Sequence, residues 1–267
     1  MMQDADTMAL PSPLEIAGRR KDWSLLIDID GTLLDMAPTP DAVVVPPAVI
    51  QILSTLEKAF DGAVALSTGR RVADADQLLA PLQLKTCGVH GTEARIAPGG
   101  EIVKLVQSVP AALLEAVMGV ALMAPGALVE PKGVGIAVHY RNVPDARPLL
   151  VQELSSVLAR FEKFALHPGR RVLEIIPHGY SKGTALAWLM QLAPFEGRRP
   201  IMIGDDAGDQ PAFAAAGKYG GLGLKVAGEH FSPVESDFQS VPHVRWWLAS
   251  VAGLSPEAIE LASVHRK

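Results

Sequence analysis

The sequence predicts an α/β fold with a parallel sheet, into which a smaller α+β unit is inserted. The first strand pattern, Trp23-Ser-Leu-Leu-Ile-Asp-Ile29, is an apolar run of the kind that both faces of a parallel sheet bury. Strand and helix patterns alternate before residue 109 and again after residue 176. The chain has 267 residues, of which 49% are hydrophobic, which suffices for one large domain or two modest ones.

The first alternating stretch contains three strand patterns and two helix patterns. Pro47 suits the first turn of the first helix, where a missing N–H costs nothing. We expect strands over residues 23–29, 62–66 and 86–90, and helices over residues 46–60 and 70–79. After the insert, we expect helices over residues 181–192 and 209–216 and strands over residues 200–204 and 219–226.

The pattern changes near Val109. Two turn signals, Lys132-Gly133 and Pro168-Gly169, each separate a pair of strand patterns. The insert is expected to hold helices over residues 110–123 and 145–160 and strands over residues 127–130, 134–141, 163–167 and 171–176. We therefore predict a flexible segment over 1–20, a core domain of 21–108 and 177–267, and an inserted α+β domain of 109–176.

Composition limits the classes of partner. The formal net charge of −5 gives no basic stripe, so nucleic acid is not expected. The longest apolar stretch, 111–129, is interrupted by Glu115 and Pro125-Gly126, so we expect no membrane span. The N-terminus lacks the pattern of a signal peptide, and Cys87 is the one cysteine. We expect a cytoplasmic protein, a monomer, with Cys87 as a buried apolar residue.

Two aspartates, Asp28 and Asp30, end the first strand pattern. Alternate side chains of an extended chain share a face, and α/β sheets bind ligands beyond the carboxyl ends of their strands. A β-hairpin around Asp30-Gly31 would explain the turn. It would leave Asp28 as a carboxylate within an apolar strand, which is costly without a metal or a partner. We therefore expect a site here.

A second acidic cluster, Gly204-Asp-Asp-Ala-Gly-Asp209, follows another apolar strand pattern. Asp205, Asp206 and Asp209 repel one another unless a cation lies among them, and hard oxygen ligands suit Mg²⁺. The alternative is a solvated loop with an aspartate capping the next helix. Together with Asp28 and Asp30, the cluster favours a metal site.

Two further segments lie at the predicted starts of helices. A hydroxyl and backbone N–H groups in Ser67-Thr-Gly-Arg70 suit a phosphate, although an ordinary N-cap has the same sequence. Lys182, in Ser181-Lys-Gly-Thr184, would place a positive charge where the helix dipole disfavours it. This conflict indicates a neighbouring anion, with a solvent-exposed lysine as the alternative.

These four segments, in this order, resemble the haloacid dehalogenase superfamily over about residues 24–213. The resemblance implies a Rossmann-like parallel-sheet core with an α+β cap inserted between the Ser67 and Lys182 segments. Five further stretches are similar to the trehalose-6-phosphate phosphatase family: 88–93, 129–133, 137–141, 174–183 and 204–213. Gly208 and Gln210 depart from that family's usual Thr and Glu, and Ile176 stands where a basic residue is common.

The resemblance assigns roles within a Mg²⁺-dependent phosphatase. Asp28 would be the nucleophile, Asp30 the acid and base, and Ser67 and Lys182 would hold the phosphate oxygens. Mg²⁺ would be bound by Asp28, the backbone carbonyl of Asp30, and Asp205. Asp206 and Asp209 would orient Lys182 or metal-bound water. Substrate binding would fall to Thr68, Gly69, Arg70, Glu130, Lys132, His139, Arg141 and Glu174, although each of the last five would otherwise be an exposed strand residue.

The expected reaction is hydrolysis of trehalose 6-phosphate, a small sugar phosphate, through an aspartyl-phosphate intermediate. A phosphatase for sucrose phosphate or mannosyl-phosphoglycerate, and a sugar phosphomutase, are the nearest alternatives. A non-catalytic sensor of Mg²⁺ or phosphate is a further one, but it leaves the catalytic set without a purpose.

Overall fold

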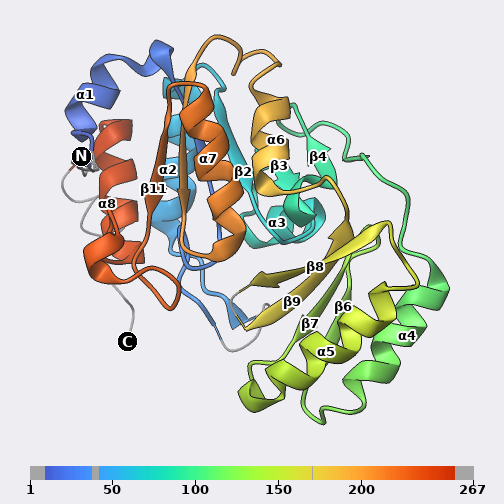
Figure 1. The fold of residues 1–267 in the computed structure, drawn as a ribbon. Helices are drawn as coiled ribbons and strands as arrows, with labels where there is room; N and C mark the ends of the chain where they lie inside the picture. The colour runs from blue at the N-terminus through green and yellow to red at the C-terminus, as the bar shows by residue number, and fades with distance from the viewer. Residues whose placement is uncertain (1–9, 38–41, 170, 256–267) are drawn as a thin grey trace, which may run out of the picture.

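The protein consists of a seven-stranded sheet between helices and a four-stranded sheet backed by two helices (Figure 1). This computed structural model describes residues 10–37, 42–169 and 171–255. The helices are α1 (Pro13–Gly18), α2 (Pro47–Ala59), α3 (Val72–Leu78), α4 (Ala111–Ala121), α5 (Arg147–Leu158), α6 (Lys182–Leu189), α7 (Gln210–Lys218) and α8 (Val241–Ala252). No helix within these ranges is long and apolar enough to cross a membrane.

The large sheet has the strand order β11-β10-β1-β2-β3-β4-β5. Its strands are β1 (Trp23–Ile27), β2 (Val64–Ser67), β3 (Lys85–Gly88), β4 (Glu93–Arg95), β5 (Val103–Lys104), β10 (Arg199–Gly204) and β11 (Leu222–Lys225). The first five in space are parallel, and all five residues of β1 are buried, as the apolar run predicts. Helices α6 and α7 pack together on one face, while α2 lies behind the sheet with α8 (Figure 1).

The fold differs from the expected elements in several places. Strands β4 and β5 are antiparallel additions to the edge, and helices α1 and α8 lie where the sequence predicts none. The predicted strand over 86–90 ends at Gly88, because Val89–Gly91 form a tight turn. The predicted helix over 70–79 begins only at Val72.

The N-terminal segment, predicted to be flexible over residues 1–20, contains helix α1. Its Ile16 is fully buried in the hydrophobic core, and α1 packs against α8. Residues 1–9 lie outside the described part of the chain.

The small sheet has the order β6-β7-β9-β8 and is antiparallel throughout. Its strands are β6 (Leu128–Pro131), β7 (Ile136–His139), β8 (Phe164–Gly169) and β9 (Val172–Pro177). Ile136, Val138, Leu173 and Ile175 are buried in one hydrophobic cluster with residues of α4 and α5. The hairpin expected at Pro168-Gly169 turns later, because β8 continues through Gly169.

The opposite face of this sheet turns toward the carboxyl edge of the seven-stranded sheet (Figure 1). The pleat places alternate residues on opposite faces, so Glu130, Ala137 and Glu174, which pair across the strands, share this face. The fold thus directs polar side chains of one sheet toward the strand ends of the other. The domain boundaries at 109 and 176 stay a prediction.

Candidate active site

Asp28 lies directly after β1, where the parallel strand leaves the core. Its backbone N–H donates to the Ile203 carbonyl at 3.0 Å, which continues the ladder with β10, and the residue is 4% exposed. The Nζ of Lys182 donates to Asp28 Oδ1 at 2.7 Å. Lys182 is therefore buried against an anion at the start of α6, as the sequence predicts, and is not a solvent-exposed lysine.

Asp205 follows β10, the strand beside β1. Gly31 passes so close to its carboxylate that a Cβ at Gly31 would lie 2.1 Å from Asp205 Oδ2. Gly31 also has a φ of 82°, so the turn after Asp30 requires glycine for two independent reasons. The Asp28-to-Gly31 segment is thereby held against Asp205.

Asp209 is fully buried and its carboxylate is already engaged. It accepts from the backbone N–H groups of Asp205 and Asp206 at 3.0 and 3.1 Å, and from Lys182 at 2.7 Å. Asp209 is thus bonded to Lys182 through one oxygen and to the backbone ahead of it through the other, and its role in orienting Lys182 stays a prediction. The side chain of Asp206 instead accepts from the Gly208 N–H at 2.8 Å, which caps the turn that leads into α7.

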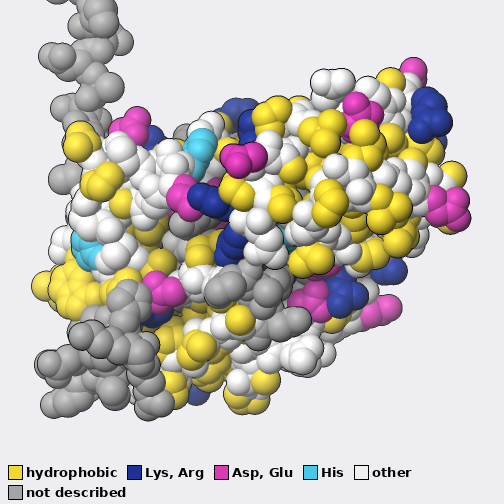
Figure 2. Space-filling view, turned by 90° about the horizontal axis from the view of Figure 1, so that it is seen from below, with side chains coloured by type: hydrophobic (Ala, Val, Ile, Leu, Met, Phe, Trp, Pro, Cys, Tyr) yellow, Lys and Arg dark blue, Asp and Glu magenta, His cyan; other side chains and the backbone are white. Residues whose placement is uncertain are grey.

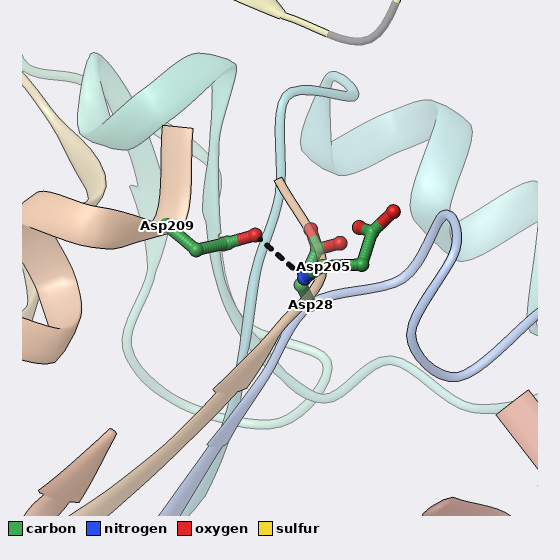
Figure 3. Close-up of side chains that lie close together, drawn as sticks. All are labelled: Asp28, Asp205 and Asp209. Atoms are coloured by element: carbon green, nitrogen blue, oxygen red, sulfur yellow. Dashed lines mark hydrogen bonds between the residues drawn. The ribbon is translucent and has the colours of Figure 1, made fainter. Parts of the chain in front are cut away.

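One carboxylate oxygen from each of Asp28, Asp205 and Asp209 lies within 4.8 Å of the others (Figure 3). Lys182 is bonded to two of these three buried carboxylates, Asp28 and Asp209. Burial raises the pKa of Asp28 well above its usual value, and Asp209 and Asp205 add to this against the opposing effect of Lys182. These hard oxygen donors fit a divalent cation such as Mg²⁺.

Asp30 has a different environment from Asp28, although both follow the same strand. Arg70 donates from Nε and Nη2 to its two carboxylate oxygens at 2.6 and 2.7 Å. The Asp30 side chain is 30% exposed, so it borders solvent. The position predicted to bind substrate, Arg70, thus contacts the predicted acid and base.

The segment after β2 supplies backbone groups to the site. Ser67 ends the strand and is 1% exposed, while Thr68 and Gly69 line the cleft. Thr68 Oγ1 accepts from the Arg70 N–H at 3.1 Å, which forms a local turn ahead of α3. The alternative of an ordinary helix N-cap does not hold, because Arg71 occupies that position without a side-chain cap.

The small sheet brings a second set of side chains to the same cleft. Lys132 Nζ donates to Glu174 Oε1 at 2.9 Å and to the Gly69 carbonyl at 2.8 Å, so it joins the two sheets. Glu130 is bonded to His139 at 2.8 Å, and Arg141 donates to the Ala37 carbonyl. Lys132 and Glu174 are buried and Glu130 is not, so the alternative of simple exposed strand residues fails for the first two.

Glu174 is the most strongly perturbed of these carboxylates. Burial would raise its pKa, but His90 and Lys132 hold it well below the usual value. His90, which is not among the predicted site residues, bonds to Glu174 from the turn after β3. The run Gly88-Val-His-Gly was the available signal, because two glycines flanking a histidine after a strand indicate a tight turn at the sheet edge.

These groups line a cleft of about 1100 Å³ between the two sheets, bordered by Asp28, Asp30, Thr68, Gly69, Arg70, His90, Glu130, Lys132, His139, Arg141, Glu174, Lys182, Asp205 and Asp206, among others. Figure 2 shows charged side chains gathered at the seam of the two parts, whereas hydrophobic side chains are frequent over the small-sheet end. Asp28, Asp205 and Lys182 lie at the floor, and the small sheet supplies the opposite wall. A cleft of this size admits a sugar phosphate.

The fold and the arrangement of this site have known counterparts. The C-terminal domain of Candida albicans trehalose-6-phosphate phosphatase superposes with a TM-score of 0.77 at 19% identity, covering 92% of this chain and 98% of that domain. A phosphatase of the haloalkanoate dehalogenase superfamily from Bacteroides thetaiotaomicron superposes with a TM-score of 0.58 at 17% identity, covering 88% and 97%. The protein therefore has the haloacid dehalogenase fold, a Rossmann-like core with an inserted cap.

The sequence comparisons identify the family within this fold. The family described as trehalose-phosphatase matches residues 26–239. A probable trehalose-phosphate phosphatase of Sinorhizobium fredii is 41% identical over 207 residues, 77% of this chain and 78% of the relative. Trehalose-6-phosphate phosphatase of Escherichia coli is 37% identical over 230 residues, 86% of each chain. The chain belongs to the trehalose-phosphatase family, which is a family of phosphoric monoester hydrolases.

Proposed function

We propose that this protein hydrolyses trehalose 6-phosphate to trehalose and inorganic phosphate, with Mg²⁺ as cofactor and an aspartyl phosphate on Asp28 as intermediate. The observation that carries the proposal is the placement of Asp28 against Lys182 and beside Asp205, at the floor of a cleft whose opposite wall is polar. The relatives named for this activity support the choice of substrate.

In the first step, Asp28 attacks phosphorus and the bond from phosphorus to the sugar oxygen breaks. Lys182 holds Oδ1 of Asp28 and leaves the second oxygen for the attack. Asp30 protonates the departing sugar oxygen, which requires one of its oxygens to part from Arg70. Trehalose then leaves, and the phosphoryl group remains on Asp28.

In the second step, Asp30 removes a proton from water, which attacks the same phosphorus. The bond to Asp28 breaks, phosphate is released and the free carboxylate returns. Ser67, the backbone around Thr68, and Lys182 hold the phosphate oxygens, while Asp209 keeps Lys182 in place. A Mg²⁺ ion held by Asp28, Asp205 and the backbone carbonyl of Asp30 would supply positive charge against the repulsion between carboxylate and phosphate.

The insert acts as a cap that selects the leaving group. A disaccharide presents many hydroxyls, and a pocket built to pair with them rejects sugars that lack them. Glu130, Lys132 and Glu174 supply charged hydrogen-bonding groups on the face that the small sheet turns to the core. His139 and Arg141 lie at the end of the same wall.

We also propose a cellular location, an oligomeric state and a class of partner. Cys87 is a buried free thiol, which agrees with a reducing cytoplasm, and we propose that the protein acts there as a monomer on a small molecule without nucleic acid or membrane.

Phosphate release across a panel of sugar phosphates tests the proposal. The panel contains trehalose 6-phosphate, sucrose 6-phosphate, glucose 6-phosphate and mannosyl-phosphoglycerate, each with and without Mg²⁺. We expect the highest kcat/KM for trehalose 6-phosphate. A higher value for another member would reassign the substrate, and isomerised sugar phosphate without phosphate release would indicate a mutase.

A further inference from the structure

The turn after β3 has an unusual backbone. Val89 and His90 have φ values of 44° and 55°, in the left-handed region, and Gly91 follows with 89°. A β-branched residue such as valine rarely adopts this region, because its side chain is crowded against the backbone. Only glycine fits at position 91, because a Cβ there would lie 2.6 Å from the Cβ of Ala185.

This strained turn is held by the loop that borders the phosphate side of the cleft. The Val89 N–H donates to the Arg70 carbonyl at 2.9 Å, and the His90 N–H donates to the Thr68 carbonyl at 3.1 Å. Backbone strain of this kind persists where the surroundings fix it, and it is concentrated at functional sites. The turn directs the side chain of His90 into the cleft.

The side chain of His90 contacts a carboxylate from the other sheet. Its Nε2 is hydrogen-bonded to Oε2 of Glu174, and the two side chains are 11% and 9% exposed. The second oxygen of Glu174 accepts from Lys132 at 2.9 Å. Glu174 is thus bonded on one side within its own sheet and on the other side by the seven-stranded sheet.

The chemistry of His90 and Glu174 determines which of them donates the hydrogen bond. An ionised carboxylate has only acceptors, so Nε2 of His90 carries the proton and donates it. Lys132 follows β6 of the same sheet as Glu174, and because its Nζ also donates to the Gly69 carbonyl, it ties the carboxylate to the core only indirectly. His90 follows β3, and its bond fixes Glu174 relative to the strand ends that carry Asp28.

We propose that His90 is a positioning residue for Glu174, and that through this carboxylate the core sets the orientation of the leaving sugar relative to Asp28. The inference rests on the proposed function, since it takes Glu174 to bind a sugar hydroxyl. A small displacement of a positioned group lowers the rate steeply, which explains why the chain maintains a strained turn here. His90 itself does not touch the reacting atoms.

The test distinguishes loss of the hydrogen bond between His90 and Glu174 from a change in the backbone conformation of the turn. His90→Asn keeps a residue that tolerates a positive φ but is too short to reach Glu174. His90→Gln has an amide N–H at nearly the reach of Nε2. His178→Asn, at an exposed position outside the cleft, is the matched control. The readout is the ratio of kcat/KM for a sugar phosphate to kcat/KM for para-nitrophenyl phosphate, which has no sugar.

We expect the ratio to fall about tenfold or more in His90→Asn, mainly through KM, since a bond to a charged group is lost. His90→Gln should recover part of the loss, and His178→Asn should keep the wild-type ratio. In a Glu174→Ala background, His90→Asn should cause no further fall in the ratio, because its target is gone.

Three results would overturn the inference. A wild-type ratio in folded His90→Asn would show that the bond has no role in recognition. A parallel loss of both activities with a lower Tm would make His90 structural, and a full additional loss in the Glu174→Ala background would place His90 on the sugar itself. The sugar phosphate used is the one that wild type hydrolyses fastest, so a failed substrate assignment leaves this test intact.

Discussion

Lys182 and Asp28, which are 154 residues apart in the sequence, are joined by a hydrogen bond of 2.7 Å in the buried floor of the cleft. Asp209 binds the same ammonium group, so Lys182 is shared by two carboxylates. Burial alone would lower the pKa of Lys182, but Asp209 and Asp28 raise it well above its usual value. Lys182 therefore stays positive throughout the working pH range and remains available to a phosphate oxygen.

The nucleophile is tested by Asp28→Asn. The amide has nearly the shape of the carboxylate but not the charge that attacks phosphorus, so turnover on every phosphate ester should vanish. Phosphate release and the far-ultraviolet circular dichroism of the same sample give the measurement and its folding control. Release at near the wild-type rate from a sequence-verified sample would refute the proposed mechanism.

Metal removal should abolish activity, and Mg²⁺ should restore it. Asp28, Asp205 and Asp209 bring three buried carboxylates together, and a divalent cation among them would reduce their repulsion of a phosphate dianion. Dialysis against EDTA followed by titration with MgCl₂ provides the measurement. Calcium should inhibit, because its larger coordination shell misplaces the attacking carboxylate. Full activity after exhaustive chelation would contradict the metal role.

The cap residues should act on the sugar and not on phosphoryl chemistry. Glu130→Ala or Glu174→Ala removes a charged hydrogen-bond acceptor, at a cost of about 1.5–3 kcal/mol, so kcat/KM on trehalose 6-phosphate should fall roughly 10- to 100-fold. Hydrolysis of para-nitrophenyl phosphate, measured in parallel, should change far less. Glu115→Ala, on the exposed face of α4, is the control.

A folded Glu130→Ala variant that treats both substrates like wild type would identify Glu130 as a surface carboxylate. The same result at Glu174 and Lys132 would remove the reason for preferring trehalose 6-phosphate over other sugar phosphates. If these residues also close the cleft against water, both activities would fall together.

Glu174 should make stability depend on acid pH. Its pKa in the folded state is well below its usual value of 4.5, so its contribution is present above that value and is lost as the pH falls through the folded-state pKa. Glu174→Gln should lower the free energy of unfolding at pH 7 by about 1–3 kcal/mol, because buried Lys132 loses its partner. The difference should persist at pH 5 and shrink below pH 4.5.

Urea unfolding at each pH measures this difference, with Glu162→Gln at an exposed position as the comparison. An unchanged difference between pH 5 and pH 3.5 would show that ionised Glu174 does not stabilise the fold.

Cys87 should be unreactive in the native protein. Burial raises the pKa of its thiol to about 12, so almost no thiolate forms at pH 8. Iodoacetamide should therefore modify the protein only after urea has unfolded it, as intact mass would show. Rapid alkylation of the native protein would mean that the strand β3 opens readily.

The floor of the site could be predicted from the sequence, whereas the contacts across the cleft could not. Asp28 and Asp205 each follow a continuous apolar run, and the ends of parallel strands meet at one edge of a sheet. The contacts of Glu174 with His90 and of Lys132 with Gly69 depend on how the small sheet lies over the core, which no local pattern specifies. His90 was missed for the same reason.

The missed elements have local causes. Strand β5 has only two residues, both exposed, so it has no apolar alternation to detect. Helix α8 is recognisable mainly from its contacts with α1 and α2, and its proline sits at the second helical position. Propensity is a weak guide where tertiary packing decides the outcome.

The alternating pleat of the small sheet has a practical consequence for protein engineering. Leu128, Glu130, His139 and Val172 line the cleft, whereas their neighbours Val138 and Leu173 pack beneath α4 and α5. Substrate-facing positions can therefore be randomised as a set while the hydrophobic layer is left untouched. A combinatorial library confined to Leu128, Glu130, His139 and Val172, which leaves the buried Lys132 and Glu174 unchanged, would explore new sugar preferences on a scaffold whose thermal tolerance stays nearly constant.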